Sequence, residues 1–168
     1  MNDDKMHETE LYLLEVFNTL LDHEVRKVRR YKQPLSLIHI AVGAQPETPE
    51  TQLCAELVTI NTLDAELRDT DIPCRNGHQL LVLLPETDES SARNACERLG
   101  KLLHTSAQTD DGIAFQVSAF IGLASIGAKL PPTSANLSNA ACKAMEHARL
   151  TQSRSAVVFS ELDEMDHA

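Results

Sequence analysis

Residues 68 to 86 decide the fold, and they read Arg-Asp-Thr-Asp-Ile-Pro-Cys-Arg-Asn-Gly-His-Gln-Leu-Leu-Val-Leu-Leu-Pro-Glu. Asn76-Gly77 lies between two runs of strand-forming residues, and such a pair favours a type I′ hairpin turn because both positions must accept positive φ. The second arm, residues 80–84, is apolar at every position. Both faces of that strand must therefore be covered, as in a central strand of a sheet with helices packed against it.

The composition is that of one ordinary globular domain. The chain has 168 residues, of which 42% are hydrophobic and 24% charged, and its net charge is −10. This charge argues against a nucleic-acid surface, because neutralising phosphates needs a surplus of Lys and Arg. The four cysteines are spaced singly, which disfavours a zinc site and a disulfide framework. No apolar run approaches the ~20 residues of a membrane span, and the N-terminus is acidic rather than signal-like, so we expect a cytoplasmic protein without a membrane partner.

Apolar periodicity predicts the remaining elements. Helices are expected over about residues 13–32, 51–67, 88–103 and 133–148, and strands over 35–42, 114–125 and 156–159. In the second helix, the stripe expected to face the core is Leu53, Leu57, Ile60, Leu63 and Leu67. This order predicts an α/β (α+β) fold, with a ferredoxin-like mixed sheet, a central β-hairpin and flanking helices. Residues 1–10 are interpreted as a polar leader, residues 11–160 as the domain, and residues 161–168 as an acidic tail that frays.

Three features of these elements have specific interpretations. The apolar stripe of the first helix can bury against the sheet or against a second copy of itself. The cationic stretch 26–32 that ends this helix is either a solvated face complementing the helix dipole or a local anion-attracting patch. His39 lies inside the apolar strand 35–42, and there we expect a hydrogen-bonded structural residue rather than a ligand.

Four segments, taken in order and spacing, resemble GGDEF domains, the catalytic fold of diguanylate cyclases. They are residues 29–37, 68–75, 82–87 and 121–125. The resemblance covers about residues 11 to 160 and implies the nucleotidyl-cyclase palm fold in a bacterial signalling protein.

The resemblance also identifies the chain as a degenerate, diguanylate cyclase-like member. Family members that make cyclic di-GMP hold two metal ions between an acidic residue ending the first strand and an acidic residue in the hairpin turn. Here the first position is Ala41, and Gly77-His78-Gln79-Leu80 matches the signature with one residue deleted. His78 and Gln79 replace both carboxylates, and Arg149 falls where a triphosphate-binding Lys usually stands. The resemblance therefore implies no catalytic residues, no metal, no cofactor and no cyclase activity.

What the resemblance retains is a product-binding motif. In the family, an Arg-x-x-Asp before the hairpin and an Arg from the following helix form an inhibitory site for cyclic di-GMP; Arg68, Asp71 and Arg98 match these positions. Arg68 can bond a phosphate or the guanine Hoogsteen edge, Asp71 can accept from guanine N1 and N2, and Arg98 can stack on or bond a second base.

Two interpretations stay open at this point. The chain is a cyclic di-GMP receptor, or these residues are relics and it is a non-binding interaction module that dimerises or holds a signalling protein through its N-terminal helix. An enzyme that uses His78 on another substrate is disfavoured, because no nucleophile and base are paired by spacing.

Overall fold

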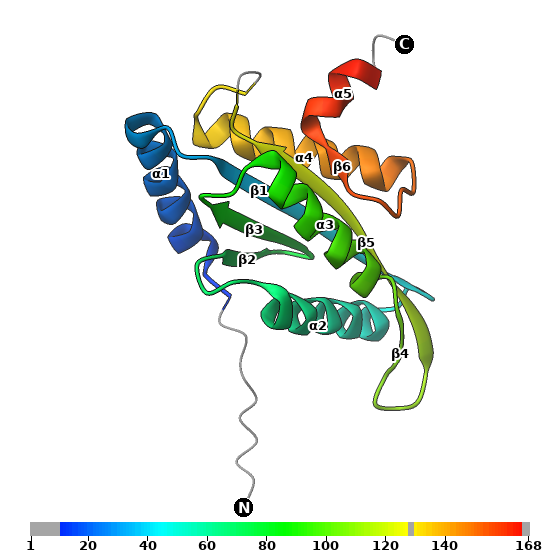
Figure 1. Ribbon diagram of the computed structural model, residues 1–168. Coiled ribbons are helices and arrows are strands. Elements are labelled where there is room, and N and C mark those ends of the chain that lie inside the picture. Colours follow the sequence, from blue (N-terminus) through cyan, green and yellow to red (C-terminus); the bar gives the residue numbers. More distant parts are fainter. Residues whose placement is uncertain (1–10, 128–129, 166–168) are drawn as a thin grey trace, which may run out of the picture.

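The computed structural model describes residues 11–127 and 130–165 (Figure 1). In these ranges the elements are α1 (Leu14–Tyr31), β1 (Leu35–Gln45), α2 (Pro49–Glu66), β2 (Ile72–Asn76), β3 (Gln79–Pro85), α3 (Glu89–Leu103), β4 (Ser106–Gln108), β5 (Ala114–Ser125), α4 (Ser134–Leu150), β6 (Val157–Val158) and α5 (Phe159–Met165). The predicted leader, residues 1–10, and the last three residues of the predicted tail lie outside the described residues. No helix in the described ranges has the length and apolar character needed to cross a bilayer.

A mixed sheet of six strands forms the centre of the molecule. Its strand order is β2-β3-β1-β5-β4, all antiparallel, and β6 pairs with β5 in parallel. The β2–β3 hairpin is therefore joined to the rest of the sheet through β1. This arrangement confirms the predicted α/β (α+β) fold with a mixed sheet and an inserted hairpin.

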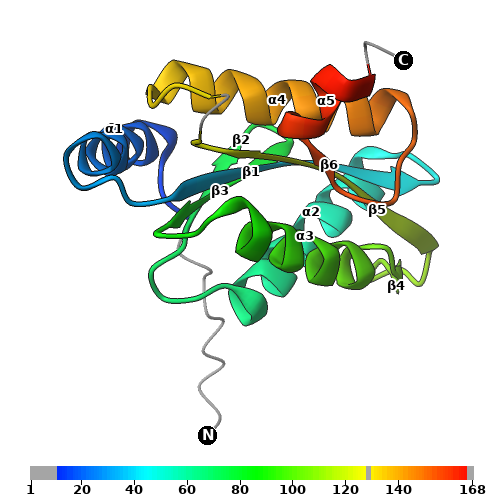
Figure 2. The ribbon, with the colours of Figure 1, turned by 45° about the horizontal axis from the view of Figure 1, so that its top comes forward.

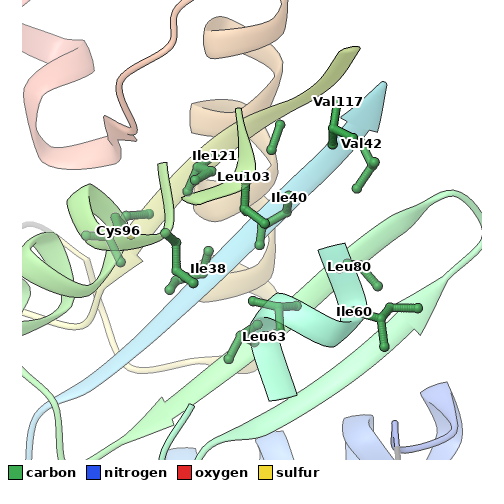
Figure 3. Close-up of a cluster of buried hydrophobic side chains, with 14 of the residues drawn as sticks. Ile38, Ile40, Val42, Ile60, Leu63, Leu80, Cys96, Leu103, Val117 and Ile121 are labelled. Atoms are coloured by element: carbon green, nitrogen blue, oxygen red, sulfur yellow. The ribbon is translucent and has the colours of Figure 1, made fainter. Parts of the chain in front are cut away.

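Helices cover both faces of the sheet, so two apolar layers form. Figure 2 shows α2 and α3 on one side of the sheet and α4 on the other, with α1 beside the sheet near β2 and β3. Ile38, Ile40 and Val42 of β1 point toward α2 and α3, as Figure 3 shows, and Leu37 packs with residues of α1 and α4. In β3, Leu80, Val82 and Leu84 belong to the first layer and Leu83 to the second. The prediction that both faces of this strand are covered is confirmed.

The hairpin turn differs from the prediction by one residue. Asn76 pairs with Gln79, so the two turn residues are Gly77 and His78, not Asn76 and Gly77. Only Gly77 has positive φ, +62°, which is the pattern of a type II′ turn rather than type I′. The observed register places Cys74 opposite Leu81. An Asn76-Gly77 turn would instead place that buried thiol opposite the polar Gln79.

The predicted inner face of α2 is wrong for its first two turns. Leu53 and Leu57 are half-exposed. The buried residues are Thr51, Ala55, Glu56, Thr59, Ile60 and Leu63. The observed inward face includes small side chains and also Glu56, which contacts Arg75 and His78 of the hairpin.

Three further differences are local. β1 continues to Gln45, past the expected end at Gly43, because its last residues still pair with β5. The segment between α3 and β5, for which no element was predicted, contains the short strand β4. The expected fraying tail is helical as far as Met165, in α5, which is tied to α3 by an ion pair between Arg93 and Glu161.

Candidate functional site

A pocket of about 190 Å³ opens between the end of α2 and α3. Its floor is apolar, formed by Ile38 and Leu84. Its polar lining is Glu66, Arg68, Asp71, Thr87, Ser91, Asn94 and Arg98. The three residues that the resemblance singled out as a ligand-binding set therefore line one pocket, although Arg68 in a loop and Arg98 in a helix are 30 positions apart in the sequence.

Asp71 holds Arg68 in place. One carboxylate oxygen of Asp71 accepts a bond from the Arg68 backbone N–H at 2.9 Å, and the other accepts from Nη2 of the Arg68 side chain at 3.1 Å. The same Nη2 donates to Oγ1 of Thr87 at 2.6 Å. The side chain of Asp71 is 4% exposed and that of Arg68 58%. The carboxylate thus acts as a buried anchor, while the guanidinium remains open to a ligand.

Arg98 is paired across the pocket. Its Nε lies 3.2 Å from a carboxylate oxygen of Glu66, the last residue of α2. Both side chains are partly exposed, Arg98 at 56% and Glu66 at 32%. This pair joins α2 to α3 over the pocket.

The positions that match the family's metal ligands lie at the other end of the sheet. Ala41 of β1 pairs directly with Gln79 of β3. The Gln79 side-chain oxygen is 2.7 Å from Nε2 of His39, which is buried in the sheet. Burial lowers the pKa of His39, against the opposing effects of the Gln79 bond and the Glu146 charge. The predicted structural role of His39 agrees with this contact, and Gln79 is engaged by it.

His78 is also engaged, by a residue that the sequence reasoning missed. Its Nδ1 lies 2.9 Å from one oxygen of Glu56, and Nη2 of Arg75 lies 3.2 Å from the other. Glu56 is 3% exposed. Its position carried a signal that was not used: Glu56 lies three residues after Leu53 and four before Ile60, so this carboxylate falls on the predicted apolar stripe itself. Within residues 11–127 and 130–165, no three His, Cys, Asp or Glu side chains gather as a set of metal ligands.

A second, larger pocket of about 730 Å³ lies where β1 ends and β5 begins. Ala41, Arg149 and Arg154 line it, and its only carboxylate among the described lining residues is that of Glu47. Arg149 donates from Nη2 to Glu146 at 2.6 Å. The pocket is cationic and amide-lined rather than acidic.

Comparison with protein families assigns this architecture. The family model described as "Diguanylate cyclase, GGDEF domain" matches residues 57–155, which is more than half of the chain. The chain belongs to the GGDEF family. No curated protein matches this GGDEF chain.

Solved GGDEF domains share its fold at low sequence identity. The GGDEF domain of YfiN (TpbB) from Pseudomonas aeruginosa has a TM-score of 0.76 and 19% identity, over 89% of each chain. SiaD from the same organism, solved with its activator SiaC, has a TM-score of 0.79 and 22% identity, over 89% of this chain and 59% of SiaD. The GGDEF domain of DgcB from Caulobacter crescentus, solved with c-di-GMP, has a TM-score of 0.77 and 11% identity, over 89% of each chain. At these identities the likeness concerns the fold.

Proposed function

We propose that this GGDEF domain is a receptor for cyclic di-GMP that does not synthesise it. The observation that carries the proposal is the convergence of Arg68, Asp71 and Arg98 on one pocket. Two guanidinium groups at the rim match the chemistry of a ligand with two phosphates and two guanines. The complex of DgcB with c-di-GMP supports the same class of ligand for this fold.

The three residues have different roles in the proposed binding of the ligand. Arg68 presents a guanidinium whose orientation is fixed on one side by Asp71 and Thr87. Preorganisation of this kind lowers the entropy lost on binding. Arg98, held only by a partly exposed ion pair, can turn to bond or stack on a base.

Catalytic inactivity is part of the same proposal. Two-metal chemistry needs oxygen ligands from both the first strand and the hairpin turn. Ala41 carries none, the Gln79 amide bonds His39, and His78 bonds the buried Glu56. The carboxylate nearest the turn is thus committed to Arg75 and His78, and is not available to a divalent ion.

Calorimetric titration with cyclic di-GMP tests the receptor proposal. We expect binding by the wild-type chain and a loss of at least about tenfold in affinity in Arg68→Ala, since hydrogen bonds to charged groups are worth about 1.5–3 kcal/mol. Lys101→Ala, which removes the same charge from the exposed face of α3, is the matched control and should bind normally. No heat at high micromolar ligand, or binding unaffected by Arg68→Ala, would refute the proposal.

Incubation of pure protein with GTP and magnesium tests the catalytic part. We expect no cyclic di-GMP above the level of a blank without protein. Product formation that rises with protein concentration would show that Ala41, His78 and Gln79 do not prevent catalysis.

A second candidate function is protein interaction through the N-terminal helix. Four neighbouring apolar side chains are exposed at the start of this helix and just before it. They are Tyr12, Leu13, Leu14 and Val16, and Leu13 is 75% exposed. Clustered exposed apolar residues mark interaction surfaces more often than chance placement does. The complex of SiaD with its activator SiaC supports a protein partner for this fold. Light scattering over a range of concentrations separates a dimer from a monomer, and a monomer that binds no cyclic di-GMP would leave both functions unsupported.

A further inference from the structure

Glu66 is the carboxylate that any ligand of the pocket must meet. The described lining has two guanidinium groups and two carboxylates. Asp71 is buried beneath Arg68 and uses both of its oxygens on that residue. Glu66 is eight times more exposed, at 32%, and pairs with Arg98. The negative charge that faces the open side of the pocket is therefore that of Glu66.

The placement of Glu66 is unfavourable to its own helix. It is the last residue of α2, and the last turn of that helix carries no basic residue. A carboxylate at this end adds to the negative pole of the helix dipole. The favourable electrostatic contact of Glu66 in the structure is thus the one with Arg98, 3.2 Å away.

This ion pair has the properties of a contact that a ligand can replace. Both partners are partly in water, so the pair contributes little to stability. A guanine edge or a phosphate of the ligand offers the guanidinium two parallel hydrogen bonds in place of this single ion-pair contact. The Glu66 carboxylate then remains near the bound anion, where like charges repel.

We infer that Glu66 competes with the anionic ligand for Arg98 and sets the affinity of the pocket. The inference rests on the proposed receptor function and concerns its regulation: cyclic di-GMP, a dianion, binds only after Arg98 has exchanged the carboxylate for the ligand. Removal of the charge at position 66 then strengthens binding, and it does so through Arg98.

Titration of the full chain with cyclic di-GMP, for Glu66→Gln beside wild type, tests this. We expect binding about fivefold tighter in Glu66→Gln at low salt, the upper range for an exposed ion pair, and a smaller gain in high salt because screening weakens the competition. In an Arg98→Ala background the same substitution should change affinity by less than about twofold. Asp64→Asn, which removes an exposed charge from the same helix outside the pocket, is the matched control and should change little.

The outcomes separate the inference from the function on which it rests. Tighter binding in Glu66→Gln that disappears in the Arg98→Ala background supports it. Wild-type binding that is unchanged or weakened in Glu66→Gln overturns it while leaving the receptor intact, and a gain that persists without Arg98 also overturns it. An absence of binding in both wild type and Glu66→Gln removes the receptor function and the inference together.

Discussion

The pocket between α2 and α3 and the hairpin turn between β2 and β3 both pair an arginine with a buried carboxylate, but they use the pair differently. In the pocket, Asp71 serves one arginine, and both Arg68 and Arg98 keep their side chains more than half exposed. At the turn, one oxygen of Glu56 forms an ion pair with Arg75 and the other is hydrogen-bonded to His78. Both oxygens of Glu56 therefore have partners within the protein, while the pocket retains cationic groups that a ligand can reach.

The difference shows how to distinguish recognition from support in polar clusters. A buried carboxylate whose oxygens are both used within the protein holds the backbone, and its loss is felt in stability. An exposed guanidinium fixed by such a carboxylate is held ready for a partner, and its loss is felt in binding. The predictions below separate these two cases.

The largest effect on stability is expected at the turn, in Arg75→Ala. This change leaves the Glu56 charge buried with only His78 as a partner. Breaking a fully buried pair costs about 3–5 kcal/mol, and we expect about 2 kcal/mol here because Arg75 is partly in water. Urea denaturation measures this loss. Glu56→Gln in the same chain should recover part of it, and a loss below about 0.5 kcal/mol without recovery would mean that the turn does not depend on the pair.

A smaller loss of stability is expected in the pocket, where substitution of Asp71 should be more harmful than substitution of Arg68. Asp71→Ala removes the acceptor for two bonds, one of them from the backbone, and should lower stability by about 1.5 kcal/mol. Arg68→Ala removes a mostly exposed side chain and should cost less than about half of that. Thermal unfolding of the two variants measures the difference. Equal losses in both would contradict the division between an anchor and an exposed recognition group.

The sequence was sufficient for the sheet, and the resemblance to GGDEF domains grouped Arg68, Asp71 and Arg98, which line one pocket; that this set binds a ligand stays a prediction. The all-apolar run of β3 required cover on both faces, and the structure provides it. The Arg-x-x-Asp spacing placed Asp71 within reach of the Arg68 backbone, since a turn of four residues brings its ends together. Arg98 was found through the family resemblance, and no local pattern marked it.

The environment of the turn was not predicted, because the sequence did not show which residues would pair with Glu56 on the inner face of α2. The stripe through Leu53 and Leu57 favoured the wrong face. The periodicity of apolar residues identifies an apolar helix face. It does not indicate which residues of a distant hairpin will pair with a buried carboxylate. The shift of the turn to Gly77 and His78 has a similar origin, because the match between side chains on neighbouring strands outweighed the turn preference of Asn76-Gly77.

Acidification should lower the stability of the protein by a smaller amount, through His39 in the sheet beside the turn. Burial lowers the pKa of His39 in the folded state below its unfolded value near 6.5, so the unfolded chain binds the proton more readily. Stability should thus be complete above about pH 6.5 and fall as the pH drops below it. His104 has a pKa lowered in the same direction, by burial and by the Arg154 charge.

The difference in unfolding free energy between pH 7.5 and 5.5 measures this effect. His39→Gln cannot titrate, and its amide can still meet Gln79, so the pH dependence should shrink and leave only the share of His104 and other groups. An unchanged pH dependence in His39→Gln would place the titration elsewhere in the chain.

The smallest effect is expected at Gly77, where the turn depends on conformation rather than charge. Gly77 has φ of +62°, and a Cβ built there would meet no atom within 4 Å. Only backbone strain therefore opposes a side chain. Asn tolerates this region better than other residues, so Gly77→Asn should cost about 0.5 kcal/mol and Gly77→Ala about 1 kcal/mol. Urea denaturation of both variants gives the order. If Gly77→Asn were as harmful as Arg75→Ala, the stability of the turn would come from its backbone, and the buried Glu56 would not be what holds it.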